Sequence, residues 1–110
     1  MEAVYEGEFD SLKDVIYAFD IHGKAVETLK ASEVAYAGYD CDNYSGVAVV
    51  LYRHNGTWWE VNGDHCSCHG LEGQWTPEET LLEAVAQRHW ELPRLREVLA
   101  RLLDEEANHA

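Results

Sequence analysis

The chain has 110 residues, 46% of them apolar, a length and composition that suit a single domain with one core and disfavour intrinsic disorder. Twenty-one acidic residues against eight basic ones give a formal net charge of −13. Most of this charge lies in residues 31–87, where Arg53 is the only basic residue. Such a charge repels nucleic-acid phosphates and anionic membranes, so we expect no direct binding to either and a basic protein as the natural partner.

The first residues lack the basic start and the apolar stretch of a signal peptide. No apolar run approaches the roughly 20 residues of a membrane-spanning helix. Three cysteines, Cys41, Cys66 and Cys68, cannot all pair with one another, and a reducing compartment would keep them as thiols. We therefore predict a cytoplasmic protein.

The first predicted element is a helix over residues 11–19. Apolar residues recur there at three- and four-residue spacing, and the sequence from Ser11 to Asp14 resembles a capping box. Residues 24–30 are ambiguous, because they could form a short helix or simply cross to a sheet.

Three β-type runs follow, at residues 34–39, 46–52 and 57–61, and they are rich in aromatic and β-branched residues. Asn55 and Gly56 separate the last two runs, and both residues accept the positive φ of a type I′ turn. The pattern predicts an antiparallel meander of three strands.

Residues 62–75 are rich in glycine and show no periodicity, which predicts a structured loop. Trp58 and Trp59 are neighbours on a predicted strand, so their rings should point to opposite faces. We expect one of them in the core and the other exposed or covered by the loop that contains Trp75.

A helix is predicted from Thr76 as N-cap, with Pro77 at its first position and Glu79 closing a capping box, to about Trp90. A last amphipathic helix begins at Pro93 and carries a regular leucine and valine stripe. The predicted fold is thus a single α+β domain over residues 1–110, a small three-stranded antiparallel meander with helices packed on one face. The last helix could instead bury its stripe in a dimer, so both monomer and homodimer stay open.

Residues 64–69 hold the densest set of reactive side chains, with His65, Cys66, Cys68 and His69 close together. Thiolates and imidazoles are the ligands that zinc prefers, but a Cys-x-Cys spacing is tighter than that of common structural zinc sites. Such a site would need a ligand from elsewhere, Cys41 or His54. We therefore expect no metal and no cofactor, and loop thiols that are buried or half-buried.

The same residues suggest a nucleophilic cysteine, Cys66 or Cys68, paired with His65 or His69 and oriented by Asp64. Sequence neighbours rarely serve as such partners, because their side chains diverge. The surrounding carboxylates would also raise the pKa of a thiol. We therefore expect no catalytic residues and no enzymatic activity.

Three segments carry a resemblance: residues 42–46, 60–75 and 77–80. Together they resemble a family of small proteins encoded by bacteriophages and prophages, with the pattern EVNGSHCSCxGLEGQW followed by PEET. The chain departs from that pattern at Asp64, where the family has serine. The resemblance covers about forty residues. It implies a phage or mobile-element origin and a small α+β fold, and it supplies no catalytic residues.

The implied origin and the charge together suggest a blocker of a host machine that handles nucleic acid, as anti-CRISPR proteins and other DNA mimics are. The partner would be a basic host protein or nucleoprotein complex, such as a CRISPR effector, in the cytoplasm of the bacterial host. Its lysines and arginines would meet carboxylates that stand in for phosphates. The candidate partner-binding residues are Asp40, Asp42, Asp64, Glu72, Glu78, Glu79, Asp104, Glu105 and Glu106. The alternative is a zinc- or thiol-containing interaction module centred on residues 64–69.

Overall fold

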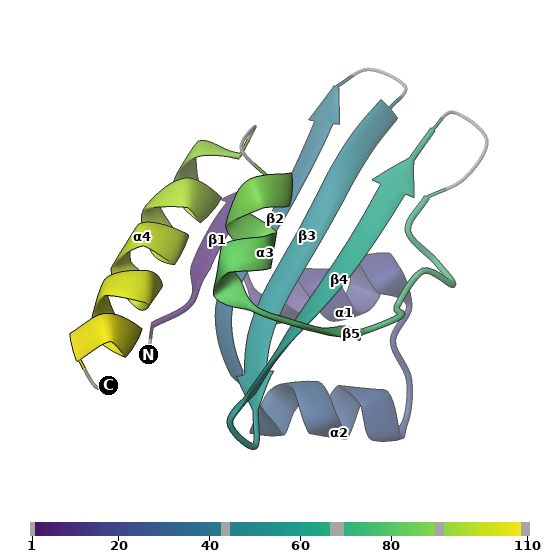
Figure 1. Ribbon diagram of the computed structural model, residues 1–110. Coiled ribbons are helices and arrows are strands. Elements are labelled where there is room, and N and C mark those ends of the chain that lie inside the picture. The colour runs from purple at the N-terminus through teal and green to yellow at the C-terminus, as the bar shows by residue number, and fades with distance from the viewer. Residues whose placement is uncertain (1, 43–44, 67–69, 90–91, 109–110) are drawn as a thin grey trace.

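The computed structural model describes residues 2–42, 45–66, 70–89 and 92–108. This part of the chain forms five strands and four helices (Figure 1). In chain order they are β1 (Val4–Gly7), α1 (Leu12–Phe19), α2 (Lys24–Ala31), β2 (Glu33–Asp42), β3 (Ser45–His54), β4 (Thr57–His65), β5 (Glu78–Thr80), α3 (Leu82–Arg88) and α4 (Pro93–Asn108).

The strands form one mixed sheet in the order β1-β2-β3-β4-β5. β1 runs parallel to β2, and the other neighbouring pairs are antiparallel. The α+β class is confirmed, and the three predicted strands are neighbours in the sheet. The prediction of a three-stranded sheet is wrong, because the short strands β1 and β5 extend it at its two edges. Strands of four and three residues are too short to show an alternating pattern in sequence.

The hairpin between β3 and β4 forms as predicted. Asn55 and Gly56 have φ values of 53° and 79°, and His54 pairs with Thr57 on either side of them. Positive φ at both central residues is the requirement of a type I′ turn, whose twist matches that of the strands. The turn therefore fixes the register of β3 against β4.

Helices cover both faces of the sheet, which corrects the prediction of a single covered face (Figure 1). α1 and α2 lie in the connection between the parallel strands β1 and β2, and they pack on one face together with Val50 of β3. α3 and α4 follow the last strand and pack on the other face, together with Val49. The nearly continuous apolar run of β3 is the sequence signal of a strand buried on both faces.

The N-terminal helix prediction is confirmed, and the ambiguous residues 24–30 are helical, within α2. Ser11 occupies the N-cap position of α1 but makes no side-chain capping hydrogen bond. Instead, the Asp14 carboxylate accepts a hydrogen bond of 2.8 Å from the backbone N–H of Asp10. In place of the predicted capping box, the Asp14 side chain is thus hydrogen-bonded to the backbone of Asp10, the residue before the N-cap.

The helix predicted from Thr76 to Trp90 is wrong in its first third. Residues 78–80 form β5 and pair with residues 58–60 of β4, and α3 begins only at Leu82. The capping-box pattern from Thr76 to Glu79 is a local signal, and here the unpaired edge of β4 offers these residues a competing set of backbone hydrogen bonds. Trp90 lies outside the described residues.

The predicted loop over residues 62–75 is also shorter than expected, because β4 continues to His65.

The last helix is confirmed as α4. Its stripe is buried against the chain's own sheet, with Leu95 and Leu99 packed among Tyr36 and Val49.

Candidate functional site

An acidic row crosses the sheet near the end of β2, the start of β3 and the end of β4. Asp40 of β2 pairs with Val47 of β3, and Val47 pairs with Asp64 of β4, so the three side chains lie side by side on one face. Val49, the next residue of β3 on that face, is fully buried by the α3 and α4 layer. Val47 is 42% exposed, and Asp40 and Asp64 are exposed as well. We call Asp40, Val47 and Asp64 the acidic row.

Strand spacing sets the dimensions of the acidic row. Neighbouring strands lie about 4.8 Å apart, so the backbones that carry the two aspartates are separated by roughly 10 Å. The pairing of β2, β3 and β4 holds this separation between the backbones. The row is therefore a pair of exposed carboxylates on backbones of fixed spacing, with an apolar residue between them.

The other predicted acids lie elsewhere. Asp42 ends β2, and its side chain lies outside the described residues; Glu72 is exposed in the segment before β5, and Glu78 and Glu79 are exposed on β5 itself. The remaining three, Asp104, Glu105 and Glu106, lie on the last turns of α4, which Figure 1 places at the opposite end of the molecule from the end of β2 and the start of β3. The eight of these acids whose side chains the structure describes do not form one surface.

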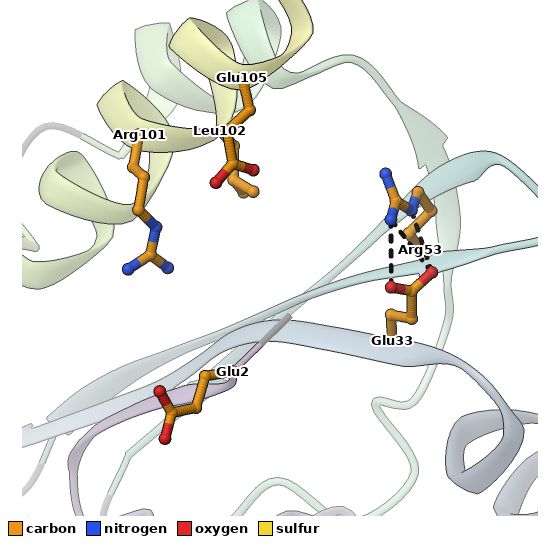
Figure 2. A pocket seen from close by; sticks show the side chains of 6 residues that line it. All are labelled: Glu2, Glu33, Arg53, Arg101, Leu102 and Glu105. Atoms are coloured by element: carbon orange, nitrogen blue, oxygen red, sulfur yellow. Dashed lines mark hydrogen bonds and ion pairs between the residues drawn. The ribbon is translucent and has the colours of Figure 1, made fainter. Parts of the chain in front are cut away.

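The acids of α4 adjoin a hollow that also contains basic side chains. Figure 2 shows Arg53 and Arg101 in its walls together with Glu105. Arg53 is paired with Glu33, with N–O distances of 3.1 and 3.3 Å, and its guanidinium lies 5.3 Å from the centre of a Trp58 ring. Two of the eight basic residues of the chain meet here, so this region has mixed charge and is a poor mimic of a phosphate backbone.

Glu106 has a structural partner. Its carboxylate accepts a hydrogen bond of 3.1 Å from the indole N–H of Trp58, which is 6% exposed. The bond joins the end of α4 to β4. The tryptophan prediction is confirmed in part, since Trp58 is in the core of the α3 and α4 face, while Trp59 is half-buried on the opposite face.

A buried carboxylate network beneath α3 was missed by the sequence analysis. Glu60 of β4 is 2% exposed, and it accepts hydrogen bonds from the guanidinium of Arg88 and, at 3.0 Å, from the amide of Asn62. Nε2 of His89 lies 2.8 Å from the second carboxylate oxygen. Because an ionised carboxylate only accepts, this nitrogen carries the hydrogen.

Burial alone would raise the pKa of Glu60, but the hydrogen bonds from His89, Arg88 and Asn62 lower it to about 2. The carboxylate is therefore ionised and fully committed to holding α3 on β4. An acid in the middle of the run from Thr57 to Val61 was the only sequence signal of this role. We assign Glu60 to structure rather than to chemistry on a substrate.

The side chain of Gln74 closes the edge of β4 beside Asp64. Its amide oxygen accepts from the backbone N–H of Asp64 at 2.9 Å, and its amide nitrogen donates to the carbonyls of Asp64 and Gly70, both at 2.7 Å. This pattern copies the bonds of a neighbouring strand. Gln74 therefore holds one end of the acidic row in place.

Other residues of the glycine-rich segment also build structure. A Cβ at Gly63 would lie 3.0 Å from Leu71 and Phe19, so this position has little room for a side chain. The ring of Trp75 stacks on Tyr52, with centroids 6.1 Å apart and planes 9° apart. Gly63, Leu71 and Trp75 of this segment thus contribute to packing.

A thiol cluster lies on the face opposite to the acidic row. Cys41 pairs with Gly46, and Gly46 pairs with His65, so the thiol and the imidazole lie on either side of a glycine. The ring of Tyr39 lies 6.3 Å from that of His65. Burial raises the pKa of the Tyr39 phenol, and the neighbouring Cys41 and carboxylates raise it further. We call Cys41, Tyr39 and His65 the thiol cluster.

The strand positions exclude one of the metal sites that the sequence suggested. His54 lies beside the hairpin turn, at the other end of β3 from Gly46, so it cannot complete a site with Cys41. Among the described residues no three or more His, Cys, Asp or Glu side chains gather as they would around a metal ion. Cys68 and His69, which belong to the predicted cluster and to the candidate cysteine–histidine pairs, lie outside the described residues.

No family model, curated protein or solved structure matches the chain. The resemblance to a phage and prophage family therefore depends on the three motif segments alone. Within the part of the chain described here, no helix has the length and apolar character needed to cross a membrane.

Proposed function

We propose that the chain is a phage-type inhibitor that binds a basic nucleic-acid-handling protein of a bacterial host, such as a CRISPR effector, and blocks its nucleic-acid groove. It would act in the host cytoplasm as a steric and electrostatic blocker, without catalysis and without a cofactor. The net charge of −13 and the motif resemblance support this proposal.

The acidic row is the observation that carries it. Asp40 and Asp64 present to a partner two carboxylates whose backbones have a fixed spacing, and each can accept charge-assisted hydrogen bonds from an arginine or lysine. Val47 between them offers an apolar contact to the aliphatic stems of those same side chains. A surface with this composition discriminates in favour of basic protein grooves.

The remaining acids contribute to partner binding to different degrees in this proposal. Glu72, Glu78 and Glu79 add to the negative field that draws a basic partner to the sheet. Glu105 and Glu106 of α4 contribute less, because Arg53 lies beside both of them, Arg101 lies beside Glu105, and Glu106 is bonded to Trp58. Asp104, on the same turns of α4, adds to the negative field.

Affinity capture from host lysate, followed by titration of the purified partner, tests the proposal. The variant Asp40→Lys/Asp64→Lys is compared with Glu83→Lys/Glu97→Lys, which makes the same change of net charge at exposed helix positions. We expect the row variant to lose roughly tenfold or more in affinity and the control to lose far less, because close charge pairs dominate binding. Equal losses, or a captured protein that DNA or RNA does not displace, would contradict the proposal.

The thiol cluster favours a second candidate function, a zinc- or thiol-containing interaction module centred on residues 64–69. The specific observation is that Cys41 and His65 flank Gly46 in one row, which brings the distant cysteine to that segment. Elemental analysis of the purified protein tests it. Stoichiometric zinc that is lost in Cys41→Ser but kept in Ser45→Ala would support the module, and absence of zinc from both would remove it.

A further inference from the structure

A second surface lies far from the acidic row, on the face covered by α1 and α2 and beside the hairpin turn. There Tyr52, His54 and Trp59 of β3 and β4 form a hollow with Thr28 of α2 and with Pro77. Its volume is about 200 Å³, and its walls are almost wholly apolar. We call these five residues the aromatic groove. Figure 1 shows α2 beside this end of the hairpin.

The sheet register explains why aromatic rings and a charge meet at this point. Tyr52 pairs with Trp59, and Trp59 pairs with Glu79, so the three side chains form one row on the same face. Tyr52 is buried, Trp59 is half-buried and Glu79 is exposed. These three side chains therefore lead from the core, through the partly exposed indole of Trp59, to the Glu79 carboxylate at the edge of the groove.

We propose that the aromatic groove binds an extended, proline-rich peptide segment that carries arginine next to its prolines. A proline ring presents a flat apolar surface to an indole, and a polyproline segment is already extended before binding, so it loses little conformational entropy. Glu79 beside Trp59 supplies the partner for the arginine. This inference does not depend on the function proposed for the acidic row.

Two other kinds of occupant fit the groove less well. An amphipathic helix needs several anchors along two or more turns, and a hollow of this volume accepts one or two side chains. An added β-strand would have to pair with β5, which has three residues, is preceded by Pro77 and carries Glu78 and Glu79. Shortness, proline and charge are the features that protect a sheet edge from pairing.

The test is a titration of the ¹⁵N-labelled protein with a synthetic peptide of alternating Pro-Pro-Arg units, followed by NMR. We expect saturable shifts of the Trp59 indole N–H and of the His54 amide, with the buried Trp58 indole unmoved. A peptide with alanine in place of every proline should bind at least about tenfold more weakly. Equal binding of the two peptides, or no saturable shift at Trp59, would overturn the proposal.

Variants of the protein distinguish binding in the aromatic groove from non-specific electrostatic attraction of the peptide. Thr28→Trp fills the hollow from the surface of α2 without removing a core residue, and we expect it to weaken binding by roughly tenfold or more. Glu79→Gln should weaken binding of the arginine peptide but not of its glutamine counterpart, while Glu97→Gln on α4 should change neither. Unchanged binding by Thr28→Trp, with its circular dichroism spectrum intact, would place the peptide elsewhere and refute the assignment.

Discussion

Glu60 and His89 are hydrogen-bonded at 2.8 Å across the boundary between β4 and the end of α3, and both side chains are buried. The contact joins residues 29 positions apart in the chain. Together with Arg88 it makes one carboxylate the main polar link between α3 and the sheet.

Replacing this carboxylate should be costly. We expect Glu60→Gln to lower the free energy of unfolding by about 1–3 kcal/mol, because the buried His89 and the half-exposed Arg88 both lose their charged hydrogen-bond acceptor. Urea unfolding at neutral pH measures the loss. Glu83→Gln, an exposed change on α3, should lie within about 0.5 kcal/mol of the parent protein.

The depressed pKa of Glu60 gives stability a defined pH dependence. The carboxyl has a pKa of about 2 in the folded protein against 4.5 ordinarily, so its contribution is complete above pH 4.5 and is lost as the pH falls toward 2. The difference in unfolding free energy between the parent and Glu60→Gln should therefore be constant above pH 4.5 and shrink below it. A difference that stayed the same down to pH 2 would mean that Glu60 is not the titrating group.

Gln74 offers a prediction about the acidic row. We expect Gln74→Ala to destabilise the protein by about 1–3 kcal/mol, because it removes three hydrogen bonds at the edge of β4. Amide hydrogen exchange at Asp64 should accelerate markedly. Thr76→Ala serves as the control, since its side chain is exposed in the neighbouring segment and should leave the exchange at Asp64 unchanged.

The hairpin turn should tolerate little change at Gly56. With φ at 79°, alanine at this position adopts a conformation that costs roughly 1–2 kcal/mol. Thermal unfolding of Gly56→Ala should therefore show a lower midpoint than that of the parent. Gly46→Ala is a poor comparison because its Cβ would lie 2.7 Å from the backbone oxygen of Asp40, so Thr76→Ala, an exposed change outside the helices and strands, is the better reference.

Partner binding through the acidic row should depend on salt. Surface charge pairs are screened over about 8–10 Å at physiological ionic strength, so affinity should fall steadily as salt is added. The parent protein should show a steeper salt dependence than Asp40→Asn/Asp64→Asn, measured by titration of the same partner. Identical slopes would mean that other residues make the charged contacts.

Local patterns predicted the parts of the fold that local interactions determine. The Asn55–Gly56 turn, α1 and α4 each depend on neighbours within a few residues, and all three form as the sequence indicates. β5 was missed because its partner, β4, lies about twenty residues earlier in the chain, and pairing with it overrides the helix-start signal of residues 76–79.

The candidate sites depend still more on register. Asp40 and Asp64 were both named from sequence, but only the pairing of β2, β3 and β4 reveals that they flank Val47. Likewise, only the strand pairing reveals that Cys41 and His65 lie on either side of Gly46. Glu60, Arg88 and His89 could not be joined from sequence, because the docking of α3 decides which polar side chains meet.

The double covering of β3 has a consequence for hydrogen exchange. The backbone of Val49 and Val50 is bonded to strands on both sides, and both residues are fully buried between the two layers of helices. Opening of an edge strand or of a terminus leaves β3 covered, so we expect exchange of these amides with deuterated solvent to require unfolding of the whole domain. Their slow rates would thus report the global free energy of unfolding in native buffer, without denaturant.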